Sequence, residues 1–155
     1  MPGREFKVET DMWVDSDPDR VFDLLTDPAH LEKWWGEEGG QQILDAEVDL
    51  RQGGRFLFRI ESRRGLMGRV QGEYMILDPG RQAMCTWHAD WAGDVPSFVK
   101  FRFEPEGRGT RVIVSQRGFL ASEEGTQILG EPWNAVLEWL ADYAERTREE
   151  PVSAG

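Results

Sequence analysis

The stretch EPWNAVLEWLADYAERTR at residues 131–148 decides the fold of this chain. Its hydrophobic residues recur every three or four positions, as they do along one face of an α-helix, at Trp133, Val136, Leu137, Leu140 and Ala144, with Tyr143 beside them. Pro132 suits the first helical position, where its missing N–H costs no hydrogen bond. About 17 residues at about 1.5 Å each make a helix about 25 Å long. The pattern predicts an amphipathic helix that needs a hydrophobic partner of similar length.

Residues 42–116 can supply that partner, because their hydrophobic residues alternate with polar ones as in half-buried strands. The apolar positions around the Gly53-Gly54 turn are Leu44, Ala46, Val48 and Leu50 before it, and Phe56, Phe58 and Ile60 after it. Two further hairpins are predicted, one pairing 67–77 with 82–88 and the other pairing 98–104 with 110–116. A looser alternation at 4–14 predicts a first strand, which makes seven antiparallel strands.

Two short helices are predicted between the first strand and the hairpins. Asp17 followed by Pro18 is a helix N-cap followed by a proline at the first helical position, and Asp27 followed by Pro28 repeats the pattern. The first helix must therefore end near Thr26, and the second is about one or two turns long.

Length, charge and composition limit the function. The 155 residues fit one domain, which we place at 4–148 with a disordered tail at 149–155. The net charge of −11 makes this an acidic protein and disfavours binding to nucleic acid or anionic membranes. One cysteine and two histidines give no metal-binding spacing, so neither a metal nor a cofactor is expected. No secretion signal and no run of about 18 apolar residues is found, so we expect a cytoplasmic protein without a membrane span.

Several stretches carry a resemblance to a known family: PDRVFDLLTDPAHLEKWWG at 18–36, DLRQGGRFLFRI at 49–60, GRVQGEYMILDPGRQAMCTW at 68–87, TRVIVSQRGF at 110–119 and the helix at 133–143. They resemble the SRPBCC / START-like (Bet v 1-like) superfamily and, within it, homologues of the activator of heat-shock protein 90 ATPase. The resemblance implies an α+β helix-grip fold. In that fold a seven-stranded curved antiparallel sheet wraps around a long C-terminal helix, and two short helices follow the first strand. Pro132 departs from the family pattern at the start of the last helix.

The resemblance also implies a range of functions. Members of the superfamily bind lipids, hormones, polyketides or other hydrophobic molecules in a cavity between sheet and helix, some cyclise polyketides, and the eukaryotic activators bind a chaperone. Because one fold hosts all of these, the function has to be argued from the residues.

The first hypothesis is binding of a hydrophobic small molecule, lipid-like or aromatic, in an apolar cavity between the sheet and the C-terminal helix. Seven Trp, eight Phe and two Tyr exceed what a small domain needs for its core. The ligand-binding candidates are Trp35, Phe56, Phe58, Tyr74, Trp87, Phe101, Trp133 and Leu137. Tyr74 is the best polar group to orient a ligand, because a buried hydroxyl needs a partner. The alternative is that the same rings simply fill the core, and an interior closed completely by them would contradict the hypothesis.

Two other hypotheses remain open. A polyketide cyclase or aromatase-type enzyme would work in the same cavity, with His88 and Tyr74 as catalytic candidates and Asp90 as a partner for His88. No serine or cysteine stands at a recognisable nucleophile spacing, so we expect binding rather than catalysis. A chaperone-cofactor-like module would instead present its acidic surface to a basic patch on a protein partner. The sequence leaves the oligomeric state open.

Overall fold

The structure is a computed structural model that describes residues 4–36, 42–61, 65, 67–89, 97–120 and 133–147. Its strands are β1 (Arg4–Val14), β2 (Gln42–Val48), β3 (Arg55–Glu61), β4 (Met67–Asp78), β5 (Gln82–Ala89), β6 (Ser97–Glu106) and β7 (Gly109–Leu120). Its helices are α1 (Pro18–Thr26), α2 (Pro28–Trp34) and α4 (Trp133–Thr147). The predictions for Pro132, Asp90 and the tail at 149–155 fall outside the described residues.

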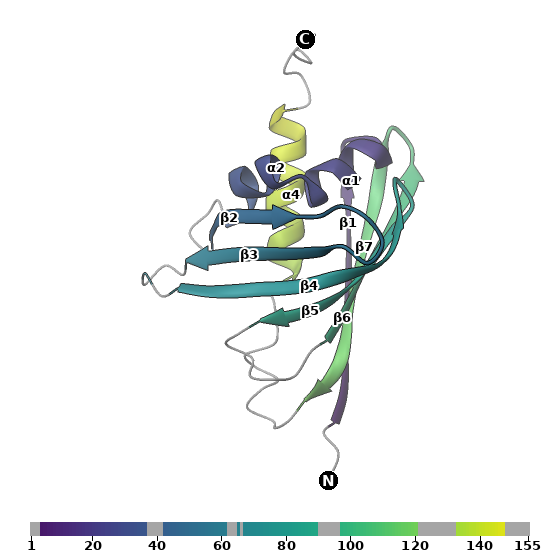
Figure 1. Ribbon diagram of the computed structural model, residues 1–155. Helices are drawn as coiled ribbons and strands as arrows, with labels where there is room; N and C mark the ends of the chain where they lie inside the picture. Colours follow the sequence, from purple (N-terminus) through teal and green to yellow (C-terminus); the bar gives the residue numbers. More distant parts are fainter. Residues whose placement is uncertain are drawn as a thin grey trace.

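The seven strands form one antiparallel sheet in the order β1-β7-β6-β5-β4-β3-β2. The three predicted hairpins are confirmed, because β2 pairs with β3, β4 with β5 and β6 with β7. The first strand pairs with β7 over its whole length, from Arg4 opposite Leu120 to Val14 opposite Thr110. In Figure 1, β2, β3 and β4 run across the direction of β1 and β7, so the sheet is strongly curved, and α4 lies against it. This is the α+β helix-grip fold expected from the sequence.

The two short helices begin and end where the Asp-Pro pairs predicted. Asp17 caps α1 by accepting a hydrogen bond from the Arg20 N–H at 2.9 Å, and Asp27 caps α2 by accepting one from the Ala29 N–H at 2.9 Å. Each cap satisfies a backbone donor that the first turn of a helix leaves without an intrahelical partner. The two helices form an elbow that ends in Trp34, the last residue of α2, and its C-cap Trp35.

The apolar face predicted for the strand before Gly53 is wrong at two positions. A register shift between Ile43 and Asp45 turns Ile43 into the core at 1% exposure and leaves Leu44 42% exposed. A bulge of this kind moves the alternation by one residue, which periodicity alone does not reveal. Leu50 lies beyond the end of β2 and is 46% exposed.

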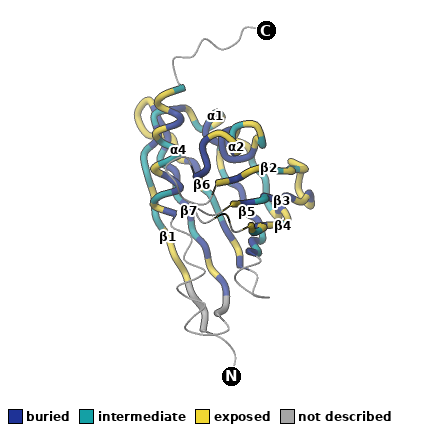
Figure 2. The backbone as a smooth tube through the Cα atoms, turned by 90° about the vertical axis from the view of Figure 1, so that its left-hand side faces the viewer, coloured by how far each residue is buried: buried dark blue, intermediate teal, exposed yellow. Residues whose placement is uncertain are grey.

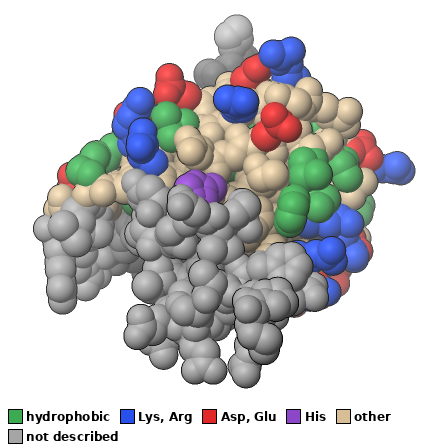
Figure 3. Space-filling view, turned by 60° about the horizontal axis from the view of Figure 1, so that its bottom comes forward, with side chains coloured by type: hydrophobic (Ala, Val, Ile, Leu, Met, Phe, Trp, Pro, Cys, Tyr) green, Lys and Arg blue, Asp and Glu red, His purple; other side chains and the backbone are tan. Residues whose placement is uncertain are grey.

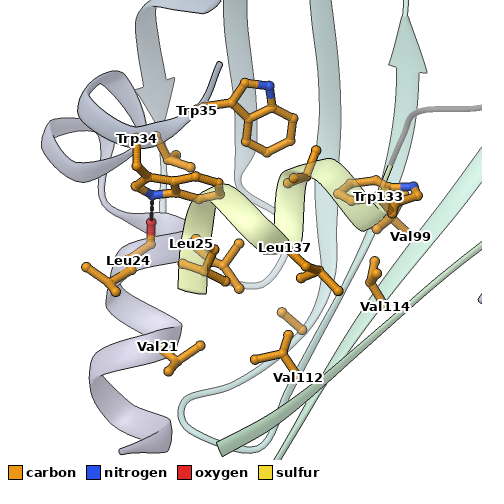
Figure 4. Packing of buried hydrophobic residues seen from close by; sticks show 14 of the residues in the cluster. Val21, Leu24, Leu25, Trp34, Trp35, Val99, Val112, Val114, Trp133 and Leu137 are labelled. Atoms are coloured by element: carbon orange, nitrogen blue, oxygen red, sulfur yellow. Dashed lines mark hydrogen bonds between the residues drawn. The ribbon is translucent and has the colours of Figure 1, made fainter. Parts of the chain in front are cut away.

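The core lies between the sheet and the helices, where Figure 2 shows buried stretches of α4, α1 and the strands. The predicted face of α4 is confirmed, because its buried residues are Trp133, Val136, Leu137, Leu140, Tyr143 and Ala144. In Figure 4, Leu137 points from α4 toward Val112 and Val114 of β7. The same view shows the Trp34 indole donating to the carbonyl of Leu24, at 2.8 Å.

Polar contacts tie α4 to the rest of the molecule at both of its described ends. The Arg20 guanidinium donates to the carbonyl of Ala144 at 3.1 Å and to the hydroxyl of Thr147 at 2.5 Å. Near the other end, the hydroxyl of Thr10 on β1 donates to the side-chain carbonyl of Asn134. These contacts fix the position of α4 against α1 and β1, and with it the interior that they enclose.

Candidate functional site

The residues predicted to bind a ligand come together as one aromatic cluster. All eight belong to the hydrophobic core or pack against it, and Phe101 alone among them is only half-buried. The Trp35 ring stacks on Trp87 with centroids 6.3 Å apart, and it meets the edge of Trp133 at 6.1 Å. Phe56 links this group to Tyr74, with ring centroids 5.4 Å apart. Strand alternation therefore placed the five of these side chains that lie on strands correctly.

The cluster encloses a small cavity of about 30 Å³ at the end of the sheet covered by α1 and α2. Six predicted residues line it: Trp35, Phe56, Phe58, Tyr74, Trp87 and Phe101. Trp133 contacts three of these rings, and Leu137 packs elsewhere in the core. This volume is far below the about 300–1,000 Å³ of typical ligand sites. The interior is therefore nearly closed by the rings.

Sequence reasoning missed five of the residues that line the cavity: Leu25, Thr26, Ala83, Cys85 and Phe103. The alternation that places Trp87 and Phe101 inward also places Ala83, Cys85 and Phe103 inward, so this signal was available. Leu25 and Thr26 reach the cavity because α1 packs over the strands, which no local pattern indicates.

The mostly apolar wall of the cavity carries the Thr26 hydroxyl, which donates to the carbonyl of Phe22 at 2.7 Å, and two further polar groups, on Trp87 and Tyr74. Trp87 is 4% exposed, and within the described structure its indole nitrogen is the one buried side-chain nitrogen or oxygen without a hydrogen-bond partner. Tyr74 is 5% exposed, and burial, with a smaller contribution from Cys85, raises the pKa of its hydroxyl. The hydroxyl therefore keeps its proton at neutral pH and can donate a hydrogen bond.

Cys85 also faces this cavity, opposite Tyr74 in the β4–β5 pairing. Burial raises the pKa of its thiol to about 12, so the thiolate needed for nucleophilic attack is disfavoured. Cys85 and Tyr74 are the ionisable side chains among the described residues that line the cavity. With both held neutral, this wall has no group poised to move protons near pH 7.

A series of buried hydrogen bonds connects the Trp133 side chain to the backbone of Trp87. The Trp133 indole donates to the side-chain carbonyl of Gln116 at 2.8 Å, and the Gln116 amide donates to the Ser97 hydroxyl at 2.8 Å. Ser97 in turn donates to the backbone carbonyl of Trp87 at 3.2 Å. The side chains of Trp133, Gln116 and Ser97 are each at most 2% exposed. This network therefore fixes the rings of Trp133 and Trp87 relative to one another.

The two catalytic candidates do not share a site. Tyr74 lines the inner cavity, whereas His88 alternates with Trp87 on β5 and lies on the outer face of the sheet. There it lines an open concavity of about 640 Å³ together with Glu47, Arg55 and Glu73. The prediction that His88 and Tyr74 share one cavity is therefore wrong. Trp87 was predicted to point inward, and its neighbour His88 must then point outward.

A second outer concavity, of about 340 Å³, crosses β1, β7, β6 and β5 and gathers cations. Its charged lining residues are Lys7, Glu9, Lys100, Arg102 and Arg117. Glu9 pairs with Lys7 at 3.7 Å and Glu104 with Arg102 at 2.6 Å, and no ion pair to Lys100 or Arg117 is found in the described part of the chain. Elsewhere the charges are mixed, as Figure 3 shows for one face, where cationic and anionic side chains are interspersed with hydrophobic ones.

None of the described helices is long and apolar enough to cross a membrane. Within the same residues, His, Cys, Asp and Glu side chains form no group of three that could hold a metal ion.

Solved structures share this fold over nearly the whole chain. A protein from Chromobacterium violaceum is 24% identical, with a TM-score of 0.72, over 90% of this chain and 96% of its own. An AHSA1-like protein from Aeromonas hydrophila is 19% identical, with a TM-score of 0.73, over 92% of this chain and 94% of its own. CalU16 from Micromonospora echinospora is 25% identical, with a TM-score of 0.64, over 94% of this chain and 80% of its own.

Sequence comparison identifies the family. No curated protein sequence matches the chain. The family model described as Activator of Hsp90 ATPase homolog 1-like protein matches residues 15–145, which include both short helices, six of the seven strands and most of α4. The chain therefore belongs to the family of Activator of Hsp90 ATPase homolog 1-like proteins, within the SRPBCC (Bet v 1-like) superfamily.

Proposed function

We propose that this protein binds a small hydrophobic molecule, aromatic or lipid-like, in the interior enclosed by the aromatic cluster, and that it does so in the cytoplasm. The observation that carries the proposal is the cavity itself, a gap walled by seven aromatic side chains, six from strands β3, β4, β5 and β6 and one, Trp35, from the residue after α2. Apolar contact would supply the binding free energy, at about 25 cal/mol per Å² of apolar surface removed from water.

Binding requires the interior to widen, because the cavity of about 30 Å³ is far smaller than the about 300–1,000 Å³ of typical ligand sites. Trp35 is the ring best placed to move. It follows the last residue of α2 and is the one cavity-lining ring that belongs to neither a strand nor a helix among the described elements. Rotation of this side chain would give a ligand access to Phe58 and Trp87, both of which Trp35 contacts.

The other two candidate functions have less support. A cyclase-type enzyme needs proton-transferring groups in the cavity, and Tyr74 and Cys85 both have raised pKa values that keep them neutral. The net charge supports a module that presents an acidic surface to a basic partner. The cationic concavity at Lys100 and Arg117 counts against it, because this side of the sheet does not present an acidic surface.

The experiment is a screen of hydrophobic compounds by thermal shift and ligand-observed NMR, repeated on Ala83→Val. Ala83 lines the cavity at 4% exposure, so two added methyl groups fill the gap without removing any aromatic ring. We expect the wild type to bind a subset of compounds and Ala83→Val to lose at least about 1.4 kcal/mol of their binding free energy, a tenfold change.

Met84→Leu is the matched control, because Met84 is the next residue on β5 and lies on the outer face beside Lys100. It should bind the same compounds as the wild type. Equal binding by the wild type and Ala83→Val would place the compounds outside this cavity and overturn the proposal.

A further inference from the structure

The indole N–H of Trp87 differs from the other indoles whose contacts the structure defines. Trp34 donates to the carbonyl of Leu24 at 2.8 Å, Trp133 to Gln116 at 2.8 Å, and Trp13 to the carbonyl of Glu106 at 3.0 Å. Trp34, Trp133 and Trp87 are core residues, at 0%, 2% and 4% exposure, yet among the described residues the Trp87 N–H has no acceptor. Buried donors without acceptors are rare because each loses its hydrogen bonds to water on folding.

The Trp87 side chain lines the cavity to which the proposed function assigns the ligand, and its indole nitrogen is buried from solvent. We propose, resting on that function, that the ligand carries a neutral oxygen acceptor, such as the carbonyl of a ketone or aldehyde, on a flat apolar body, and that this oxygen accepts the Trp87 N–H. The contact would satisfy the donor that the protein leaves without an acceptor.

The position of Tyr74 gives the same oxygen a second donor. Tyr74 and Trp87 lie on the same face of neighbouring strands, since Tyr74 pairs with Cys85, two residues before Trp87. Diagonal neighbours of this kind have backbones about 7–8 Å apart, within reach of aromatic side chains that converge on one atom. Both rings also contact Phe56, at centroid distances of 5.4 and 5.9 Å. A carbonyl oxygen has two lone pairs and can accept from both.

The described wall of the cavity carries no positive charge, which disfavours a ligand with an anionic oxygen. The described lining residues include no lysine, arginine or histidine, so a carboxylate bound there would be buried without a counter-charge. The wall therefore selects against fatty acids and other carboxylates in favour of neutral acceptors. A pure hydrocarbon would fit the apolar wall but leave the Trp87 N–H without a partner.

Three naphthalene derivatives of nearly equal shape test the acceptor: 2-acetylnaphthalene with a carbonyl, 2-isopropenylnaphthalene with a CH₂ group in its place, and 2-naphthoate with a charge. Isothermal titration of the wild type should give the ketone about 3- to 10-fold higher affinity than the alkene, the value of one net hydrogen bond. The naphthoate should bind most weakly. With ¹⁵N-labelled tryptophan, the Trp87 indole resonance should shift with the ketone and not with the alkene.

Trp87→Phe keeps an aromatic ring and removes the N–H, so its preference for the ketone over the alkene should fall at least about 2-fold, and the Tyr74 hydroxyl supplies what remains. Trp34→Phe is the matched control, because its indole donates to Leu24 and not into the cavity, and it should keep the preference. If Trp87→Phe does not fold, the shift of the Trp87 indole resonance in the wild type still tests the hydrogen bond to the ligand oxygen.

Each outcome is decisive. Equal affinity for ketone and alkene, or a ketone preference that Trp87→Phe does not reduce, overturns the acceptor contact while leaving hydrophobic binding intact. Tightest binding by the naphthoate overturns the neutral-ligand assignment. Failure of all three compounds to bind overturns this inference, and the proposed function falls only if the broader screen also fails.

Discussion

At the scale of single residues, Trp34 and Trp87 form a natural comparison, because both indoles are buried and only one of them donates a hydrogen bond. Trp34→Phe leaves the buried carbonyl of Leu24 without its donor, whereas Trp87→Phe removes a donor that has no acceptor in the described protein. Both changes remove a similar volume. We expect Trp34→Phe to lower the free energy of unfolding by about 1–3 kcal/mol more than Trp87→Phe. Urea denaturation measures both values, and equal losses would contradict the assignment.

The buried thiol of Cys85 makes the free energy of unfolding depend on pH. Burial raises its pKa from the ordinary value of 9.0 to about 12, so between these values the folded chain keeps a proton that the unfolded chain releases. Stability must therefore fall as pH rises above about 9, by up to about 1.4 kcal/mol per pH unit for one such group. Between pH 9 and 10, below the ordinary pKa of Tyr74, Cys85→Ala should flatten this decline. Identical pH slopes for the wild type and Cys85→Ala in urea denaturation would refute this account.

At the scale of elements, α4 is held at its C-terminal end by Arg20 of α1, through Ala144 and Thr147. We expect Arg20→Met to lower the free energy of unfolding by about 1–3 kcal/mol, since charge-assisted hydrogen bonds to half-buried groups are lost. Amide exchange at residues 144–147 should also become faster.

Arg146→Met is the control, because Arg146 pairs with Asp142 one turn away on the exposed side of the same helix. That pair is worth about 0.3–0.5 kcal/mol. A loss for Arg20→Met no larger than this would show that the bonds from α1 do not hold α4 in place.

The elements also show where sequence patterns succeed. The Asp-Pro pairs predicted both short helices because caps and proline act within a few residues, and the apolar stripe predicted every buried position of α4. Leu44 was misplaced because the bulge in β2 depends on its pairing with β3, a contact between segments distant along the chain. Local patterns carry no information on such shifts.

At the scale of the whole molecule, the site was only partly predictable. Alternation predicted the inward direction of the aromatic lining residues on the strands, but the remaining volume of about 30 Å³ results from how the rings pack in three dimensions. Likewise, whether the Trp87 N–H finds a hydrogen-bond acceptor depends on every residue around that ring. The cationic concavity is a further case, since its four basic residues come from β1, β6 and β7 and total composition gives only the net charge of −11.

The most direct test of the central claim is native mass spectrometry of the protein purified from its own host, followed by denaturation and identification of any released compound. The account predicts a stoichiometric, flat, apolar molecule that carries a neutral oxygen acceptor and is absent from the Ala83→Val variant. A protein that carries no such molecule, and whose melting temperature no compound of a hydrophobic library raises, would contradict it.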